Sequence, residues 1–64
     1  MYKVNFFTNR ELKNSSVFQS ESRAISCLLS HSRYNSLKVT NDRMYASSEG
    51  NTFEMEIEII HCEY

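Results

Sequence analysis

The sequence predicts one small α+β domain over residues 1–64, with an antiparallel sheet of three to four strands and one helix on one face, in the order β(β)αββ. Apolar and polar residues alternate in Tyr2–Phe7 and in Thr52–His61, which is the period of a half-buried strand. Between Ser20 and Ser32, apolar residues follow helical spacing instead. With 41% hydrophobic and 23% charged residues, the chain is too apolar for a disordered segment and long enough for one small core.

The first third of the chain contains one clear strand and one ambiguous segment. The strand is Tyr2–Phe7, and the polar residues 8–11 can form a turn. Residues 12–18 allow two alternatives. They can form an edge strand beside the first one, although their apolar pattern is poor, or they can extend the helix, because Ser16 and Gln19 match a capping box. The shorter helix, with the edge strand before it, is the preferred interpretation.

The helix is expected from Ser20 to about Ser32. Ser20 or Ser22 can cap its N-terminus by accepting a hydrogen bond from a free backbone N–H. Glu21 lies near the positive end of the helix dipole, where an acidic side chain is favourable. Four apolar residues form the stripe that is expected to face the sheet: Ala24, Ile25, Leu28 and Leu29.

The second half of the chain contains the remaining strands. Residues 37–39 alternate, residues 40–43 indicate a turn or bulge because Asn and Asp bond their own backbone two residues on, and residues 44–46 resume the strand. Gly50-Asn51 suits a hairpin before Thr52–His61, the clearest strand. The expected core consists of Val4, Phe6, Phe18, Ala24, Ile25, Leu28, Leu29, Leu37, Val39, Phe53, Met55, Ile57 and Ile59.

Charge is divided unevenly along the chain. Residues 1–48 hold all seven basic and three acidic side chains, whereas residues 49–64 hold five acidic side chains and no basic one. Three of these acids and one apolar residue share the face of the last strand that points away from the helix. Two interpretations are open: Lys3 and Lys38 on neighbouring strands neutralise the row, or the row binds a protein partner with a basic patch. The residues of the row are Glu54, Glu56, Glu58 and Ile60.

No set of residues indicates catalysis, a metal site or a cofactor. Cys27 and His31 lie one helical turn apart, as two metal ligands can, but His61 and Cys62 are adjacent on a strand and point to opposite faces. We therefore expect a non-enzyme without bound metal or cofactor, in which Cys27 is a structural thiol and both cysteines stay reduced. The apolar runs are too short for a membrane span, and no secretory signal peptide is visible, so a cytoplasmic location is expected.

Nucleic-acid binding, or modulation of transcription, is the alternative function. Six basic residues are mixed with two tyrosines, and a sheet that presents aromatic rings can stack bases. However, no dense basic run is present, and the acidic strand would repel phosphates. The residues concerned are Arg10, Lys13, Arg23, Arg33, Lys38, Arg43, Tyr34 and Tyr45.

The chain has fewer than 100 residues, is rich in Asn, Ser, Lys and Glu, is nearly free of Pro and Gly, and follows a strand–helix–strand plan at Tyr2–Phe7, Ser20–Ser32 and Thr52–His61. In these features it resembles the short early proteins of large AT-rich tailed phages. The resemblance implies a protein that binds and inhibits a host enzyme, a defence protein or a toxin in the host cytoplasm. We expect a non-enzymatic protein-binding module, for which a homodimer is one source of added stability.

Overall fold

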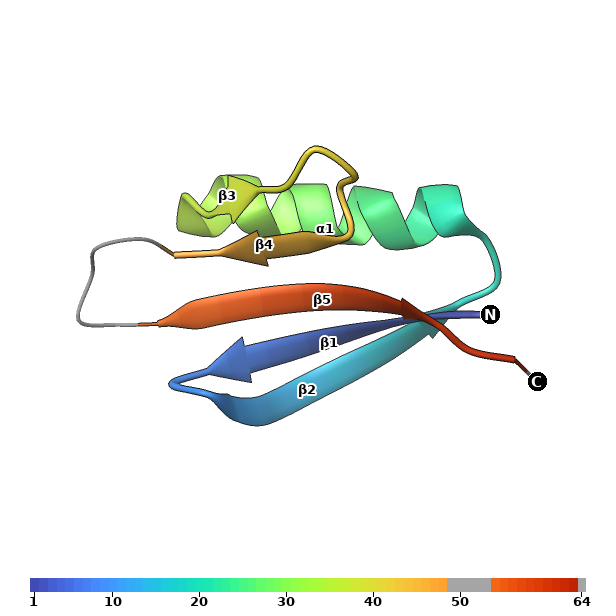
Figure 1. Cartoon of the computed structure of the whole chain (residues 1–64), viewed down its shortest axis with the longest axis horizontal. Coiled ribbons are helices and arrows are strands. Elements are labelled where there is room, and N and C mark those ends of the chain that lie inside the picture. Colours follow the sequence, from blue (N-terminus) through green and yellow to red (C-terminus); the bar gives the residue numbers. More distant parts are fainter. Residues whose placement is uncertain (49–53, 64) are drawn as a thin grey trace.

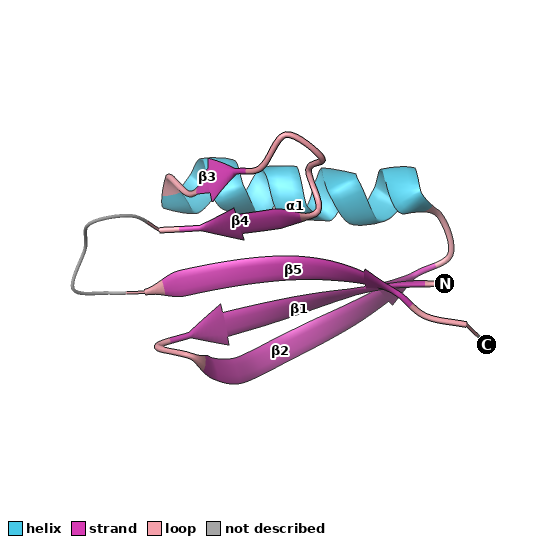
Figure 2. Cartoon of the chain, viewed as in Figure 1, coloured by secondary structure: helices cyan, strands magenta, loops and turns pink. Residues whose placement is uncertain are grey.

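The computed structural model describes residues 1–48 and 54–63. Within these residues the chain forms five strands and one helix (Figure 1), in the order β1 (Tyr2–Thr8), β2 (Glu11–Phe18), α1 (Glu21–Asn35), β3 (Lys38–Val39), β4 (Tyr45–Ser47) and β5 (Met55–His61). The strands form one antiparallel sheet with the spatial order β2-β1-β5-β4-β3. The helix packs against one side of this sheet (Figure 2), and no other described element covers the opposite side. The α+β class is therefore confirmed.

The last strand, β5, lies in the centre of the sheet between β1 and β4. Val4 pairs with Ile59, and Ile57 pairs with Ala46 on its other side. At one end of the molecule the Met1 amino group donates to the Cys62 carbonyl oxygen at 3.0 Å, and the Cys62 N–H donates to the Met1 carbonyl oxygen at 2.7 Å. The central strand thus joins the N-terminal hairpin to the C-terminal half of the sheet.

The ambiguous segment of the sequence is a strand. Asn9 and Arg10 both have positive φ, 52° and 66°, and a two-residue turn of this kind matches the twist of an antiparallel hairpin. This turn places β2 beside β1 as the edge strand of the sheet. The register shifts between Phe6 and Phe7, where Lys13 is the extra residue of a β-bulge. The preferred interpretation, an edge strand before a shorter helix, is confirmed.

Defined caps set both ends of α1. The Ser20 Oγ accepts a hydrogen bond from the Arg23 N–H at 3.2 Å, so the expected cap at Ser20 is confirmed and the earlier helix start is wrong. The helix continues three residues past its expected end, to Asn35, and stops where Ser36 adopts a left-handed φ of 56°. In the described part of the chain, no helix is long and apolar enough to cross a membrane.

The segment after the helix forms two strands, β3 and β4, where the sequence predicted one interrupted strand. The Asp42 Oδ1 accepts hydrogen bonds from the Met44 N–H at 3.1 Å and from the Thr40 hydroxyl at 2.5 Å. With Arg43 at a φ of 62°, these bonds reverse the chain, and the Thr40 N–H then donates to the Tyr45 carbonyl oxygen at 2.9 Å. The expectation of three to four strands in the order β(β)αββ is therefore wrong in detail, because the described residues follow the order ββαβββ.

The core lies between α1 and the sheet. Its buried apolar residues are Val4, Ala24, Leu28, Ala46, Ile57 and Ile59. Five other expected core residues are partly buried against them: Phe6, Phe18, Ile25, Leu37 and Val39. Leu29 was wrongly assigned to the core. It is 37% exposed, because it is rotated by about 100° from Leu28 onto the outer side of the helix. The expected Gly50-Asn51 hairpin and Phe53 lie outside the described residues.

Candidate partner-binding surface

We call the side of the sheet opposite α1 the open face. The two sides can be assigned because the Phe6 ring packs on His31 of α1, with ring centroids 4.9 Å apart, and Val4 and Ile57 are buried in the core. On each strand, the residues that alternate with these helix-facing residues point to the open face. Glu56, Glu58 and Ile60 lie on it, as the alternation predicted. Together the open face consists of Lys3, Asn5, Phe7, Leu12, Ser15, Val17, Lys38, Tyr45, Ser47, Glu56, Glu58 and Ile60.

Asn5 holds Glu58 in place on this face. The two residues are opposite each other on β1 and β5, and the Asn5 Nδ2 donates a hydrogen bond of 3.0 Å to the Glu58 Oε1. Asn5 is only 7% exposed, so its amide group has little freedom to move. Among the described residues, no donor reaches its buried Oδ1. The contact therefore orients the Glu58 carboxylate without neutralising its charge.

Tyr45 orients the Glu56 carboxylate in the same way. Its hydroxyl donates a hydrogen bond of 2.6 Å to the Glu56 Oε2. This bond, then partial burial and the nearby Glu56 and Glu58 charges, raise the pKa of Tyr45 above its usual 10.0. The tyrosine is thus a neutral donor near neutral pH. Both carboxylates of the open face are held by neutral side chains.

Glu54 differs from the other two acids of the predicted row. It precedes the first residue of β5, and its carboxylate forms an ion pair of 3.5 Å with the Arg10 guanidinium. Its backbone N–H donates to the Asn9 Oδ1 at 3.4 Å, which anchors it to the β1–β2 turn. The structure therefore brings Glu56, Glu58 and Ile60 together on one strand face and places Glu54 just before the start of β5, beside a base.

The register also bears on the idea that cross-strand bases neutralise the row. Lys3 lies opposite Ile60 and Val17, and Lys38 lies opposite Ser47. Glu58 is flanked directly by Asn5 and Tyr45, and Glu56 by Phe7 and Ser47. Direct cross-strand pairing is the arrangement in which opposite charges stabilise a sheet most. Neither glutamate of β5 has a basic residue in that position.

Apolar side chains border the two carboxylates. Leu12 and Val17 on β2 are 52% and 51% exposed, and Ile60 on β5 is 41% exposed. Phe7 lies between Leu12 and Glu56 in one cross-strand row and is half-buried. Sequence reasoning missed the β2 residues and Phe7, because the face of each depends on the β1–β2 register and its bulge. The doublet Phe6-Phe7 was the available signal, since adjacent strand residues point to opposite faces.

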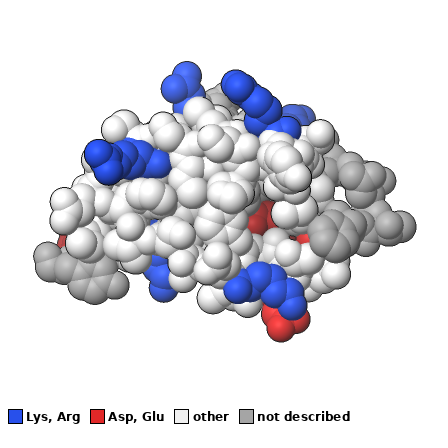
Figure 3. All heavy atoms as spheres, turned by 180° about the vertical axis from the view of Figure 1, so that it is seen from behind, with Lys and Arg blue, Asp and Glu red and all other residues white. Residues whose placement is uncertain are grey.

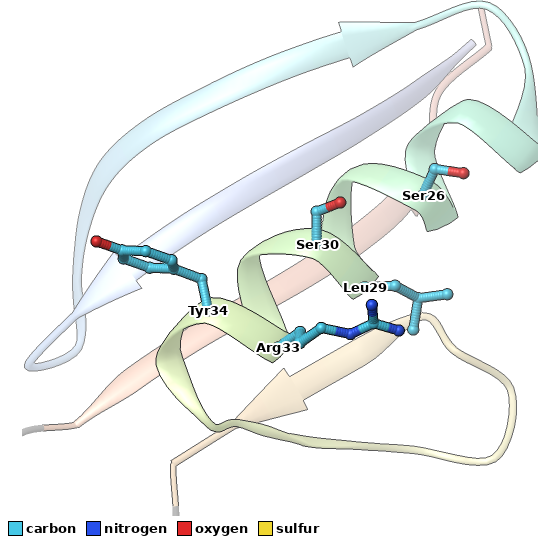
Figure 4. A pocket seen from close by; sticks show the side chains of 5 residues that line it. All are labelled: Ser26, Leu29, Ser30, Arg33 and Tyr34. Atoms are coloured by element: carbon cyan, nitrogen blue, oxygen red, sulfur yellow. The ribbon is translucent and has the colours of Figure 1, made fainter.

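The outer side of α1 has a different character. A hollow of about 470 Å³ is lined by Ser26, Leu29, Ser30, Arg33 and Tyr34 (Figure 4), with Leu29 and Arg33 projecting to one side of the helix and Tyr34 to the other. Tyr34 is 89% exposed. Viewed from the helix side, the molecule shows more Lys and Arg than Asp and Glu surface (Figure 3). The hollow has no nucleophile paired with a base.

The histidines and cysteines do not gather into one site. The His61 ring packs on Tyr2, with centroids 4.9 Å apart, and His31 packs on Phe6. Both cysteines are free thiols, and burial raises the pKa of Cys27. Among the described residues, no group of three or more His, Cys, Asp or Glu side chains could hold a metal ion.

Comparison with known proteins gives no further guide to the chemistry. No protein-family model matches the chain, and no curated protein and no solved structure matches it either. The arguments for function therefore come from the molecule's own surfaces.

Proposed function

We propose that this chain is a non-enzymatic protein-binding module, and that its open face binds a protein surface carrying basic and apolar side chains. One observation carries the proposal: Glu56 and Glu58 lie on an uncovered sheet face, held by Tyr45 and Asn5, with no base directly opposite either of them. Carboxylates in this setting favour a cationic partner group.

The bordering apolar residues supply the second part of such an interface. Charges steer the encounter between two proteins, whereas buried apolar anchors contribute most of the affinity. Ile60 and Val17 lie on either side of Lys3, and Leu12 lies beside Phe7. Because Tyr45 and Asn5 already orient the carboxylates, binding would order fewer side chains, and the entropic cost of association would be smaller.

A module of this kind would act by covering part of its partner. In the setting that the phage resemblance implies, the partner is a host enzyme, a defence protein or a toxin in the host cytoplasm, and binding blocks its active surface. The two free thiols, Cys27 and Cys62, suit such a reducing compartment.

The experiment compares capture of partners from host lysate by three forms of the protein. Glu56→Gln/Glu58→Gln removes two charges but keeps oxygen acceptors for Tyr45 and Asn5, so the fold should persist. Glu11→Gln/Glu63→Gln changes the net charge equally at exposed positions off the open face. We expect the wild type and this control to enrich the same protein, and the open-face variant to lose it. Equal capture by all three forms would rule out the open face as the interface.

Nucleic-acid binding is the second candidate, and the helix side favours it. Arg23, Arg33 and Tyr34 are all exposed on α1, and the Tyr34 ring, which is 89% exposed, can stack on a base. Fluorescence anisotropy with a labelled single strand tests this. Binding that weakens linearly in a plot of log affinity against log salt, and that Tyr34→Ala reduces, would support it; absence of binding at low salt would exclude it.

A further inference from the structure

Each of the two carboxylates on the open face keeps one oxygen available to a ligand. Glu58 accepts from the Asn5 Nδ2 with its Oε1, and Glu56 accepts from the Tyr45 hydroxyl with its Oε2. Among the described residues, 1–48 and 54–63, no donor and no basic side chain bonds to the other oxygen of either carboxylate. The Glu56 Oε1 and the Glu58 Oε2 can therefore accept hydrogen bonds from a group outside the chain.

The two carboxylates are held apart. Glu56 and Glu58 are two residues apart on β5, so their Cα atoms are about 7 Å apart along the strand. Asn5 holds Glu58 from β1, on one side of β5, whereas Tyr45 holds Glu56 from β4, on the other side (Figure 1). A ligand that bonds to both carboxylates must therefore carry donors that point in more than one direction.

Tyr45 adds an aromatic ring beside both carboxylates. It is directly opposite Glu58 in the ladder, it bonds to Glu56, and its side chain is 36% exposed. A hollow of about 230 Å³ opens here, with Tyr45, Ser47 and Glu56 among the residues that line it. An aromatic ring attracts a cation placed over its face. The ring, the hollow and the two negative charges together favour a cationic group that can lie flat.

Asn5 gives an independent sign that a donor is missing at this place. It is 7% exposed, its Nδ2 bonds to Glu58, and no donor among the described residues reaches the buried Oδ1 of the same amide group. Buried polar atoms in proteins almost always have a hydrogen-bond partner. Because Nδ2 and Oδ1 belong to one amide, the unpartnered oxygen lies next to the Glu58 carboxylate. A donor-rich group bound at Glu58 is placed to supply the missing bond.

These features match a guanidinium group better than an ammonium group or a metal ion. A guanidinium carries five N–H donors in one plane, bonds to carboxylates through pairs of donors and stacks on aromatic rings. The donors of a lysine ammonium all lie on one atom, so it bridges two separated acceptors less well. Among the described residues, no third acidic, His or Cys side chain joins the two glutamates to form a metal site.

We propose that the open face binds one arginine side chain of its protein partner, with the guanidinium bonded to Glu56 and Glu58 and lying against the Tyr45 ring. The inference rests on the proposed function, because it names the group on the partner that the open face recognises. One N–H of the guanidinium is directed toward the Asn5 Oδ1. Ile60, which is 41% exposed and follows Glu58 on the same face, contacts an apolar residue beside the arginine.

Two capped peptides that differ in one side chain test this chemistry. The probes are acetyl-Gly-Leu-Arg-Leu-Gly-amide and the same peptide with lysine in place of arginine. Each is titrated into the isotope-labelled full chain and followed by two-dimensional NMR. The arginine peptide should shift the backbone signals of Glu56 and Glu58 and the side-chain amide signals of Asn5. It should bind at least about fivefold more tightly than the lysine peptide.

Variants of the full chain locate the recognised group. Glu56→Gln and Glu58→Gln, each alone, should remove the preference for arginine, because the guanidinium needs both carboxylates. The control Glu11→Gln/Glu63→Gln should keep the preference, since both positions lie off the open face. Tyr45→Leu should weaken binding of the arginine peptide more than that of the lysine peptide, whereas Tyr45→Phe retains the ring and should keep most of the preference. Circular dichroism checks that each variant is folded.

The outcomes decide the inference. Equal affinity for the two peptides, signal shifts that lie outside the open face, or no shift at the highest peptide concentration would overturn it. If Tyr45→Leu does not fold, the single glutamate variants decide. Failure of this inference can be told from failure of the proposed function. If the peptides bind equally but Glu56→Gln/Glu58→Gln still loses its partner in lysate, the open face is the interface and only the arginine assignment is wrong.

Discussion

The hydroxyl of Tyr45 lies 2.6 Å from the Glu56 carboxylate, diagonally across the ladder between β4 and β5. In the register of these strands, Tyr45 is directly opposite Glu58, so one phenol lies beside both carboxylates of the open face. A neutral donor in this position orients an acid and leaves its charge available. This relationship is the structural basis for assigning recognition to the open face.

Removing the phenol should therefore have a small effect on stability. We predict that Tyr45→Phe lowers the free energy of unfolding by no more than about 1 kcal/mol near neutral pH, because the lost hydrogen bond lies close to the surface. The sign of its pH dependence is more informative. A raised pKa in the folded state means that folding favours the protonated phenol. This contribution is fully present below the usual pKa of 10.0 and is lost as the pH rises through the higher folded value.

Urea unfolding between about pH 8 and about pH 11.5 measures this contribution. The wild type should lose stability above pH 10 more steeply than Tyr45→Phe, and the other tyrosines act equally in both proteins. Parallel stability curves would show that the Tyr45–Glu56 bond does not form in solution.

The packing of β5 against α1 gives a second prediction, with a matched control on the helix. Ile57 is 1% exposed, so Ile57→Ala should lower the free energy of unfolding by roughly 2–5 kcal/mol, enough to unfold so small a domain. Leu29→Ala removes the same kind of side chain from the outer side of α1 and should change it by less than about 0.5 kcal/mol. Thermal melts of both variants check this. Equal destabilisation would contradict the assignment of the two sides of the helix.

Leu29 also shows where sequence reasoning stops. Four apolar residues within six positions were enough to predict the helix. Which of these residues are buried depends on the sheet surface against which the helix packs, and the helical pattern alone does not reveal that surface. β1, α1 and β5 were predictable because each repeats its pattern several times. β3 and β4 contain two and three residues, too few for a period, and the Asp42 turn between them separates what looked like one strand.

The candidate site was predictable to a similar extent. Alternation along one strand was enough to place Glu56, Glu58 and Ile60 on a common face. It could not reveal Asn5 or Tyr45 as their hydrogen-bond donors, because those contacts depend on the register between strands far apart in sequence. Nor could it separate Glu54, which contacts the Asn9-Arg10 turn just before the start of β5.

Cys27 provides a prediction about thiol reactivity. Burial raises the pKa of the Cys27 thiol, so the fraction present as the reactive thiolate is smaller in the folded protein than in the unfolded chain. In a Cys62→Ser background, labelling of Cys27 by a thiol reagent near pH 8 should be much slower in buffer than in urea. Labelling at the same rate in both conditions would show that the thiol is not protected by packing.

The β3–β4 turn should be sensitive to acid. Hydrogen bonds from the Thr40 hydroxyl and the Met44 N–H lower the pKa of Asp42 below its usual 3.8. The stabilising contribution is therefore present above pH 3.8 and is lost as the pH falls through the lower folded value. Asp42→Asn keeps an oxygen acceptor but cannot titrate. The free energy of unfolding of this variant should fall less than that of the wild type as the pH is lowered. If the two proteins show the same pH dependence in acid unfolding, Asp42 does not have this role.

The most direct test of the central claim is the association rate of the chain with its captured partner, measured at several salt concentrations. If the open face steers the encounter, Glu56→Gln/Glu58→Gln should slow association about tenfold at low salt, and the difference from the wild type should shrink as salt screens the charges. Glu11→Gln/Glu63→Gln should associate at nearly the wild-type rate. Association rates and affinities that are the same for the open-face variant, the control and the wild type would contradict the account.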